Sequence, residues 1–164
     1  MKRVKKLDFE SIDDIEQEPD KFNKYYKKIS TICNGLPYKF RERLRYLRES
    51  MGYTREQLEE NSYISVQTIK QIEINSERGY SIETILALCI GMNLPPEFSF
   101  DLIRIGGFNI ETNSCINNCM YCFILRNMYN LNIDDVNQFL EINGVPPLSL
   151  ENKQLKNKKM HKIK

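Results

Sequence analysis

The stretch "TREQLEENSYISVQTIKQIE", residues 54–73, decides the fold. It holds two short amphipathic segments on either side of a polar, turn-like middle. Thr54 and Gln57 have the spacing of a capping box, so a helix begins here and ends within two turns. Ser65 can cap a second helix. That second helix has two inward-facing apolar positions, Ile69 and Ile72.

Helical periodicity also governs the flanking sequence. Apolar residues recur at helical spacing in six further segments, about 11–33, 40–51, 81–92, 96–107, 114–129 and 132–143. Pro19 interrupts the first of them. No segment has the alternation of a strand. The predicted fold is therefore all-α, a five-helix domain with additional N- and C-terminal helices.

Two helices joined by a short turn can present the second helix to the major groove of DNA. Its outward positions here are Val66, Gln67, Lys70 and Gln71. Glutamine can pair with adenine N6 and N7, and valine can contact a thymine methyl group. Lys70 can reach a phosphate. The alternative for the two glutamines is an ordinary solvated helix face.

The longer segment "LRESMGYTREQLEENSYISVQTIKQIE", residues 47–73, resembles the Cro/repressor-type (XRE-like) helix-turn-helix regulators. The residues that carry the resemblance are Arg48, Thr54, Leu58, Ile64, Ser65, Ile69, Ile72 and Glu73. It continues through "SIETILALCIGMNLPP", residues 81–96. The resemblance implies a compact five-helix domain that binds double-stranded operator DNA, usually as a homodimer, and acts as a transcriptional regulator, most simply a repressor.

The same resemblance implies roles for individual residues. The implied DNA-binding positions are Arg55, Ser65, Val66, Gln67, Thr68, Lys70, Gln71 and Arg78. Arg55 corresponds to a phosphate contact, and Ser65, Val66, Gln67 and Gln71 correspond to base-reading positions. Thr68, Lys70 and Arg78 correspond to positions at or near the DNA backbone. Arg48 and Glu73 correspond to a buried ion pair between the first and third helices.

Three positions depart from the family pattern. Glu59 replaces a small residue, and Tyr63 and Asn75 replace glycines. A tyrosine in the turn requires a positive φ at some energetic cost, and Glu59 places a carboxylate near the helix crossing. Glu59, Tyr63 and the weak net charge of +2 keep an alternative function open, a protein-interaction or antitoxin-like module that keeps the fold, binds an unknown protein partner and does not read DNA.

The composition of the chain predicts its cellular location and its domain boundaries. No stretch approaches the roughly 20 apolar residues that a membrane-spanning helix needs. The basic N-terminus "MKRVKKLDFE" lacks an apolar signal segment, so we expect a cytoplasmic protein. The tail "ENKQLKNKKMHKIK" carries six lysines and one glutamate. We expect a basic arm and helix over 1–36, the helix-turn-helix domain over 37–108, a helical pair over 109–150 and a basic disordered tail over 151–164.

Three of the five cysteines, Cys115, Cys119 and Cys122, have C-x3-C-x2-C spacing. This spacing resembles the cluster loop of radical S-adenosylmethionine enzymes, but that loop belongs to a large α/β barrel, for which this chain lacks the length and the strands. On a helix the three share one face, so we expect core packing, with a redox-sensitive or metal-binding cluster as the alternative. No catalytic motif is present, and we predict no enzyme activity, metal or cofactor.

The helical pair near the C-terminus is predicted to pack on the domain and to form a dimer interface. The apolar residues expected to do so are Phe123, Leu125, Met128, Val136, Phe139 and Leu140.

Overall fold

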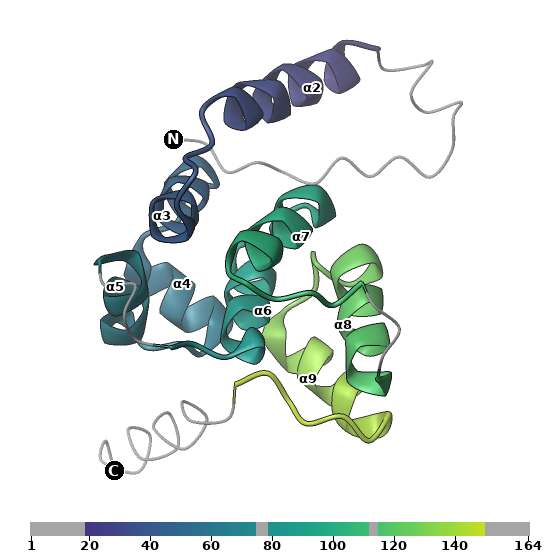
Figure 1. Cartoon of the computed structure of the whole chain (residues 1–164). Helices are drawn as coiled ribbons and strands as arrows, with labels where there is room; N and C mark the ends of the chain where they lie inside the picture. Colours follow the sequence, from purple (N-terminus) through teal and green to yellow (C-terminus); the bar gives the residue numbers. More distant parts are fainter. Residues whose placement is uncertain (1–18, 75–78, 112–114, 150–164) are drawn as a thin grey trace, which may run out of the picture.

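The computed structural model describes residues 19–74, 79–111 and 115–149, and these ranges contain helices and connecting turns but no strand. The helices, labelled as in Figure 1, are α2 (Pro19–Asn34), α3 (Phe40–Ser50), α4 (Arg55–Ser62), α5 (Val66–Ile74), α6 (Ile82–Gly91), α7 (Pro96–Ile105), α8 (Ile116–Asn127) and α9 (Ile133–Ile142). The all-α prediction is confirmed. The predictions about the basic arm, Asn75, Arg78 and the lysine tail lie outside the described residues.

Helix α6 forms the centre of the molecule. All its residues from Ile85 to Gly91 are buried, as is Met92 behind it. A helix that is apolar on every side is stable in water only when other elements surround it. Helices α4, α7, α8 and α9 pack around α6, while α3 packs against α5 and α7 (Figure 1). The helix-turn-helix pair is therefore attached to α6 through α4 and to α3 through α5.

Helices α4 and α6 approach each other closely at Gly91. A Cβ atom built on Gly91 would lie 2.8 Å from Cβ of Ser62 and 3.1 Å from Cδ1 of Leu58. Both neighbours are fully buried, so neither can move aside without disturbing the core. The absence of a side chain at Gly91 thus sets the distance between the helix-turn-helix pair and the core.

Gly91→Ala is expected to lower the free energy of unfolding by about 1–3 kcal/mol, because the added methyl group overpacks this contact. Chemical denaturation of the purified protein measures the change. Gly79→Ala is the matched control, because a Cβ at Gly79 meets no atom within 4 Å. A Gly91→Ala variant as stable as the parent would mean that α4 and α6 are not in close contact.

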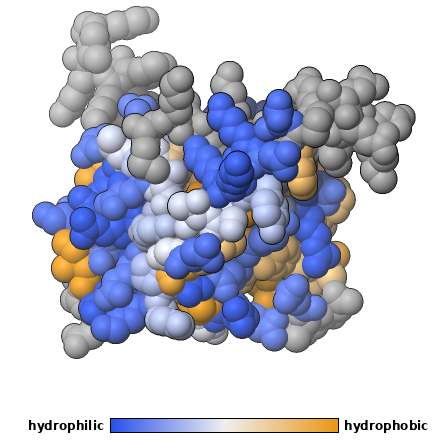
Figure 2. Space-filling view, turned by 90° about the horizontal axis from the view of Figure 1, so that it is seen from above, coloured by the Kyte–Doolittle hydropathy of each residue, from blue (hydrophilic) through white to orange (hydrophobic). Residues whose placement is uncertain are grey.

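Helix α2 is set apart from the bundle (Figure 1). It begins at Pro19, a residue that suits the first turn of a helix because its missing N–H has no partner to lose there. Its C-terminal end is anchored by Ile32, which is buried, whereas Tyr26 is 62% exposed. Seen from above, the surface is mainly hydrophilic, with hydrophobic side chains in several separate areas (Figure 2).

The predicted core packing of the three cysteines is wrong for two of them. Cys115 and Cys119 are exposed and Cys122 is half-buried, where its Sγ lies 3.2 Å from the carbonyl oxygen of Ile110. The buried face of α8 is a neighbouring stripe, formed by Tyr121, Ile124 and Leu125. These larger side chains remove more apolar surface from water than thiols do, so they face α6 and α7.

The predicted packing of the C-terminal pair on the domain is largely confirmed. Leu125, Val136 and Leu140 are buried, and Met128 and Phe139 pack against the core at partial exposure. Phe123 differs from the prediction, because it is 46% exposed. Its ring stacks on that of Phe139, with a centroid distance of 5.4 Å. This aromatic pair lies at the surface of the pair of helices.

Among the described residues, no helix combines the length and the apolar character needed to cross a membrane.

Candidate nucleic-acid interface

The first helix of the pair begins as the sequence predicts. Thr54 Oγ1 accepts a hydrogen bond of 3.1 Å from the backbone N–H of Gln57, and Gln57 Oε1 accepts one of 3.1 Å from the backbone N–H of Thr54. These reciprocal bonds form a capping box, which satisfies two donors that a helix start leaves unpaired. The start of α4 is therefore fixed by its own sequence.

A turn of three residues, 63–65, joins α4 to α5. Tyr63 adopts the left-handed conformation with φ of 59°, as its position in the turn predicts, and its N–H donates to the Glu59 carbonyl. For a residue with a side chain this conformation costs roughly 1–2 kcal/mol. Ser65 Oγ then accepts from the N–H of Thr68 at 3.1 Å and caps α5. The strained residue is thus held between two regular helix ends.

One buried carboxylate fixes the orientation of α5. The side chain of Glu73 is 0% exposed, and its Oε1 accepts a hydrogen bond of 2.6 Å from Arg48 Nε on α3. This confirms the predicted ion pair. Arg48 also donates from Nη1 to the Tyr53 carbonyl oxygen at 2.8 Å, so its own charge is well compensated.

Glu73 has a second partner that the sequence did not reveal. Arg55, the first residue of α4, donates from Nε to Glu73 Oε2 at 2.7 Å, and its Nη2 lies 2.6 Å from the same oxygen. The Arg55 side chain remains 30% exposed. The phosphate contact predicted for Arg55 stays a prediction, and any such contact would have to be made by a guanidinium already bound to Glu73.

The outer face of α5 is polar and open to solvent. Gln67 and Lys70 are exposed, whereas Ile69 and Ile72 are buried as predicted. Val66, Thr68 and Gln71 are half-buried, as is Ser65 before the helix. The hydroxyls of Ser65 and Thr68 lie 2.8 Å apart and bond to each other. Gln67 and Lys70 are therefore the predicted contact residues that project furthest outward from this helix.

Two residues from the C-terminal part of the chain form hydrogen bonds with the end of α4 and the turn that follows it. The sequence pattern does not predict these contacts. The Tyr63 hydroxyl donates to Asp134 Oδ2 on α9 at 2.6 Å, and Ser149 Oγ donates to the Ser62 carbonyl oxygen at 2.8 Å. Burial is the main cause that raises the pKa of the Tyr63 phenol to about 12, and the hydrogen bond to Asp134 adds to it. The phenol therefore remains a donor at neutral pH.

Comparison with known proteins agrees with this geometry. A helix-turn-helix family model matches residues 44–99, which run from α3 into α7. The match supports the resemblance of this segment to the Cro/repressor-type helix-turn-helix family. No curated protein and no solved structure matches the chain significantly.

The match to this family model supports one class of activity in general. Helix-turn-helix domains of this type belong to DNA-binding regulators of transcription, not to enzymes. In such domains the second helix of the pair is the one that contacts bases, and here this helix is α5. In the part of the chain that the structure describes, no three His, Cys, Asp or Glu side chains are placed to hold a metal ion.

Proposed function

We propose that the protein is a transcriptional repressor that reads operator DNA by placing α5 in the major groove. The observation that supports this most is the combination of exposure and rigidity at α5. Gln67 and Lys70 project into solvent, while Glu73 near the end of the same helix is buried and bound to two arginines. A polar face held in one orientation fulfils the requirement that base-reading side chains arrive already positioned.

In this proposal the side chains have distinct tasks. Gln67 hydrogen-bonds a base edge, with Gln71 beside it and Val66 at a thymine methyl group. Lys70 neutralises a phosphate and contributes affinity that does not depend on sequence. Ser65 lies at a base-reading position at the start of the helix and Thr68 lies near the DNA backbone, while Arg55 and Arg78 remain proposed backbone contacts.

The protein acts as a homodimer in this proposal, because two copies of α5 can then occupy half-sites about 34 Å apart. The surface of the C-terminal pair offers a self-association site, since Phe123 is 46% exposed beside Phe139 and Ile142 is 76% exposed. Analytical ultracentrifugation is expected to detect a dimer. A monomer both free and on DNA would contradict this part of the proposal.

A second function is favoured by one observation. The exposed carboxylates Glu56 and Glu60 lie on α4, the helix that precedes the turn, and Arg55 on the same helix is bound to Glu73. This reduces the positive charge that a DNA-binding surface requires. In that alternative the outer face of α5 binds a protein partner and not a duplex.

The salt dependence of duplex binding separates the two functions. Affinity for a random-sequence duplex, followed by fluorescence anisotropy, is expected to fall linearly with the logarithm of salt concentration. Lys70→Ala is expected to reduce the magnitude of that slope by about 1, because one phosphate contact is lost.

Arg126→Ala is the matched control for this measurement, because it removes one positive charge from α8, which lies at the opposite end of the molecule from α5 (Figure 1). Its slope is expected to equal that of the parent. Binding without salt dependence, or an equal effect of the two substitutions, would favour the protein-interaction module.

A further inference from the structure

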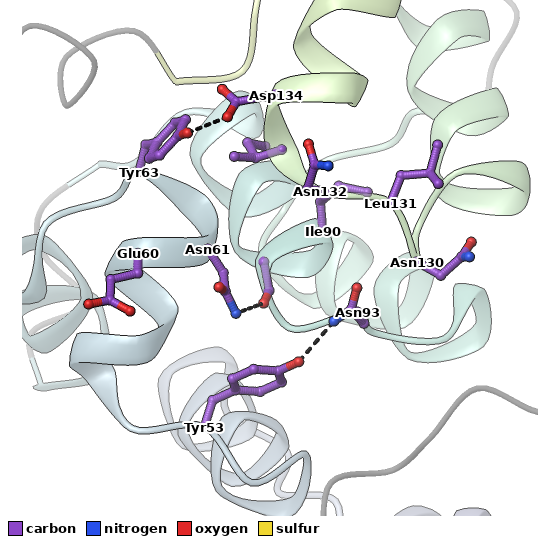
Figure 3. Close-up of a pocket in the computed structure, with 12 residues that line it drawn as sticks. Tyr53, Glu60, Asn61, Tyr63, Ile90, Asn93, Asn130, Leu131, Asn132 and Asp134 are labelled. Carbon is purple, nitrogen blue, oxygen red and sulfur yellow. Dashed lines mark hydrogen bonds between the residues drawn. The ribbon is translucent and has the colours of Figure 1, made fainter. Parts of the chain in front are cut away.

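A cavity of about 420 Å³ lies directly behind the helix-turn-helix turn. Its walls come from the end of α4, the end of α6 and the segment that joins α8 to α9 (Figure 3). Tyr63, the left-handed residue of the turn, forms part of the wall. Cavities of roughly 300–1,000 Å³ are the size of small-molecule sites in proteins.

The charged side chains that line the cavity are all acidic. Two of the residues that line the cavity are carboxylates, Glu60 and Asp134, and none is a lysine, arginine or histidine. Asp134 Oδ1 accepts no hydrogen bond from the described residues, and Glu60 forms no ion pair with them. Carboxylates without counter-ions in a concave site concentrate a negative potential there, which attracts cations.

The polar side chains of the wall are held in place by the protein. Asn61 Nδ2 donates to the Gly91 carbonyl oxygen at 3.2 Å, and Asn93 Nδ2 donates to the Tyr53 hydroxyl at 2.8 Å (Figure 3). Tyr63 is held by its bond of 2.6 Å to Asp134. These bonds link α4, α6 and α9, so the cavity is formed before any ligand enters, which lowers the entropic cost of binding.

We propose that this cavity binds a small organic cation of the diamine or polyamine class, with one ammonium group at Asp134 and further N–H groups at the amide oxygens of the wall. An organic cation fits better than a metal ion. Only two acidic side chains line the wall, and no group of three ligands exists in the described ranges. A bare divalent cation would also leave most of the volume empty.

Binding of the organic cation would affect the turn between α4 and α5. An ammonium group at Oδ1 of Asp134 would draw charge away from Oδ2, which accepts the hydrogen bond of the Tyr63 hydroxyl, and Tyr63 sets the direction in which the chain leaves α4. The ligand would therefore change DNA affinity, a consequence that rests on the proposed function. The binding itself does not depend on DNA.

Isothermal titration calorimetry of the full-length protein without DNA tests the site, with 1,4-diaminobutane and spermidine as probes at 0.15 M salt. Both are expected to bind, and 1,4-butanediol, which has hydroxyls in place of the ammonium groups, is expected not to bind. Magnesium chloride should give no saturable heat. Saturable binding of the diol equal to that of the diamine would overturn the requirement for a cation.

Asp134→Asn keeps an acceptor for Tyr63 and is expected to weaken the binding of 1,4-diaminobutane about tenfold, because it removes a charge at contact distance. Glu60→Gln leaves the hydrogen bonds of the wall intact and is expected to weaken binding in the same direction. Glu141→Gln removes an equal charge from the exposed end of α9, outside the cavity, and should have no effect. No binding by the parent, or an equal loss in all three variants, would overturn the proposal.

The failure of this inference can be told apart from the failure of the proposed function. If the diamine binds in calorimetry but the protein does not bind any duplex, the cavity is a ligand site and the repressor function is wrong. If duplexes bind and the diamine does not, the inference is wrong and the function stands. Because diamines also bind DNA, their effect on duplex affinity is measured against the same titration with Asp134→Asn.

Discussion

Glu73→Ala is expected to lower the free energy of unfolding by about 3–5 kcal/mol, because it removes the buried carboxylate that compensates Arg48 and leaves that arginine only the exposed carboxylate of Glu49 and a carbonyl oxygen. The Glu73 side chain is fully buried and accepts hydrogen bonds from Arg48 and Arg55. Arg48 is itself only 6% exposed, so its guanidinium could not recover hydration in the variant. The loss should also release α5 from α3 and α4, and DNA affinity should fall with stability.

Urea denaturation followed by circular dichroism measures this change. Glu111→Ala serves as the control, because Glu111 forms an exposed ion pair with Arg126, with 3.8 Å between Oε1 and Nη2. Exposed pairs contribute about 0.2–1 kcal/mol, so the control should remain close to the parent. If Glu73→Ala costs no more than Glu111→Ala, the carboxylate does not anchor the helix.

Gln67→Glu is expected to weaken binding to the operator about a hundredfold, which is nearly 3 kcal/mol. The substitution keeps the size of the side chain but exchanges an amide donor for a negative charge. That charge would face base acceptors and two phosphate strands, and like charges at an interface cost several kcal/mol. Gln67 is exposed, so the fold and the thermal unfolding temperature should not change.

Fluorescence anisotropy at fixed salt with a duplex recovered by selection measures this affinity. Gln138→Glu introduces the same charge at an exposed position of α9, away from α5, and is expected to have little effect. Gln67→Ala should fall between the two, with a cost of about 1–3 kcal/mol and relaxed preference at one base position. Equal losses for Gln67→Glu and Gln138→Glu would indicate that only net charge matters.

Much of the helix-turn-helix could be predicted because its determinants are local. The capping box of Thr54 and Gln57 involves residues three apart, and the positive φ of Tyr63 follows from its place in a short turn. The apolar positions of α5 follow from helical spacing. The Arg48–Glu73 pair is not local, and it was predicted only from the resemblance to a family in which the two positions correspond.

The contacts that could not be predicted depend on how distant segments meet. Arg55 reaches Glu73 because α4 and α5 cross at an angle that no sequence pattern specifies. Asp134 binds Tyr63 across a separation of 71 residues. The first contact gives Arg55, a predicted phosphate-binding residue, a carboxylate partner. The second holds Tyr63 in the turn between α4 and α5. Both contacts involve residues of the proposed DNA-binding unit.

Helix α8 shows why a periodic stripe can mislead. The stripe of cysteines and the stripe of Tyr121, Ile124 and Leu125 both have helical spacing. Periodicity identifies each as one face of a helix, but it does not say which face meets α6. The amount of apolar surface decides which face is buried, and it favours the larger side chains over the thiols.

Cys89, by contrast, lies on the central helix α6, where burial raises the pKa of its thiol to about 12.

Methylation interference on a selected operator duplex tests most directly whether α5 lies in the major groove. Dimethyl sulfate modifies guanine N7, which faces the major groove, and adenine N3, which faces the minor groove. We expect methylation of guanine N7 within the recognised sequence to block binding and methylation of adenine N3 there to have no effect. Interference from adenine N3 alone, or from neither position, would contradict the placement of α5.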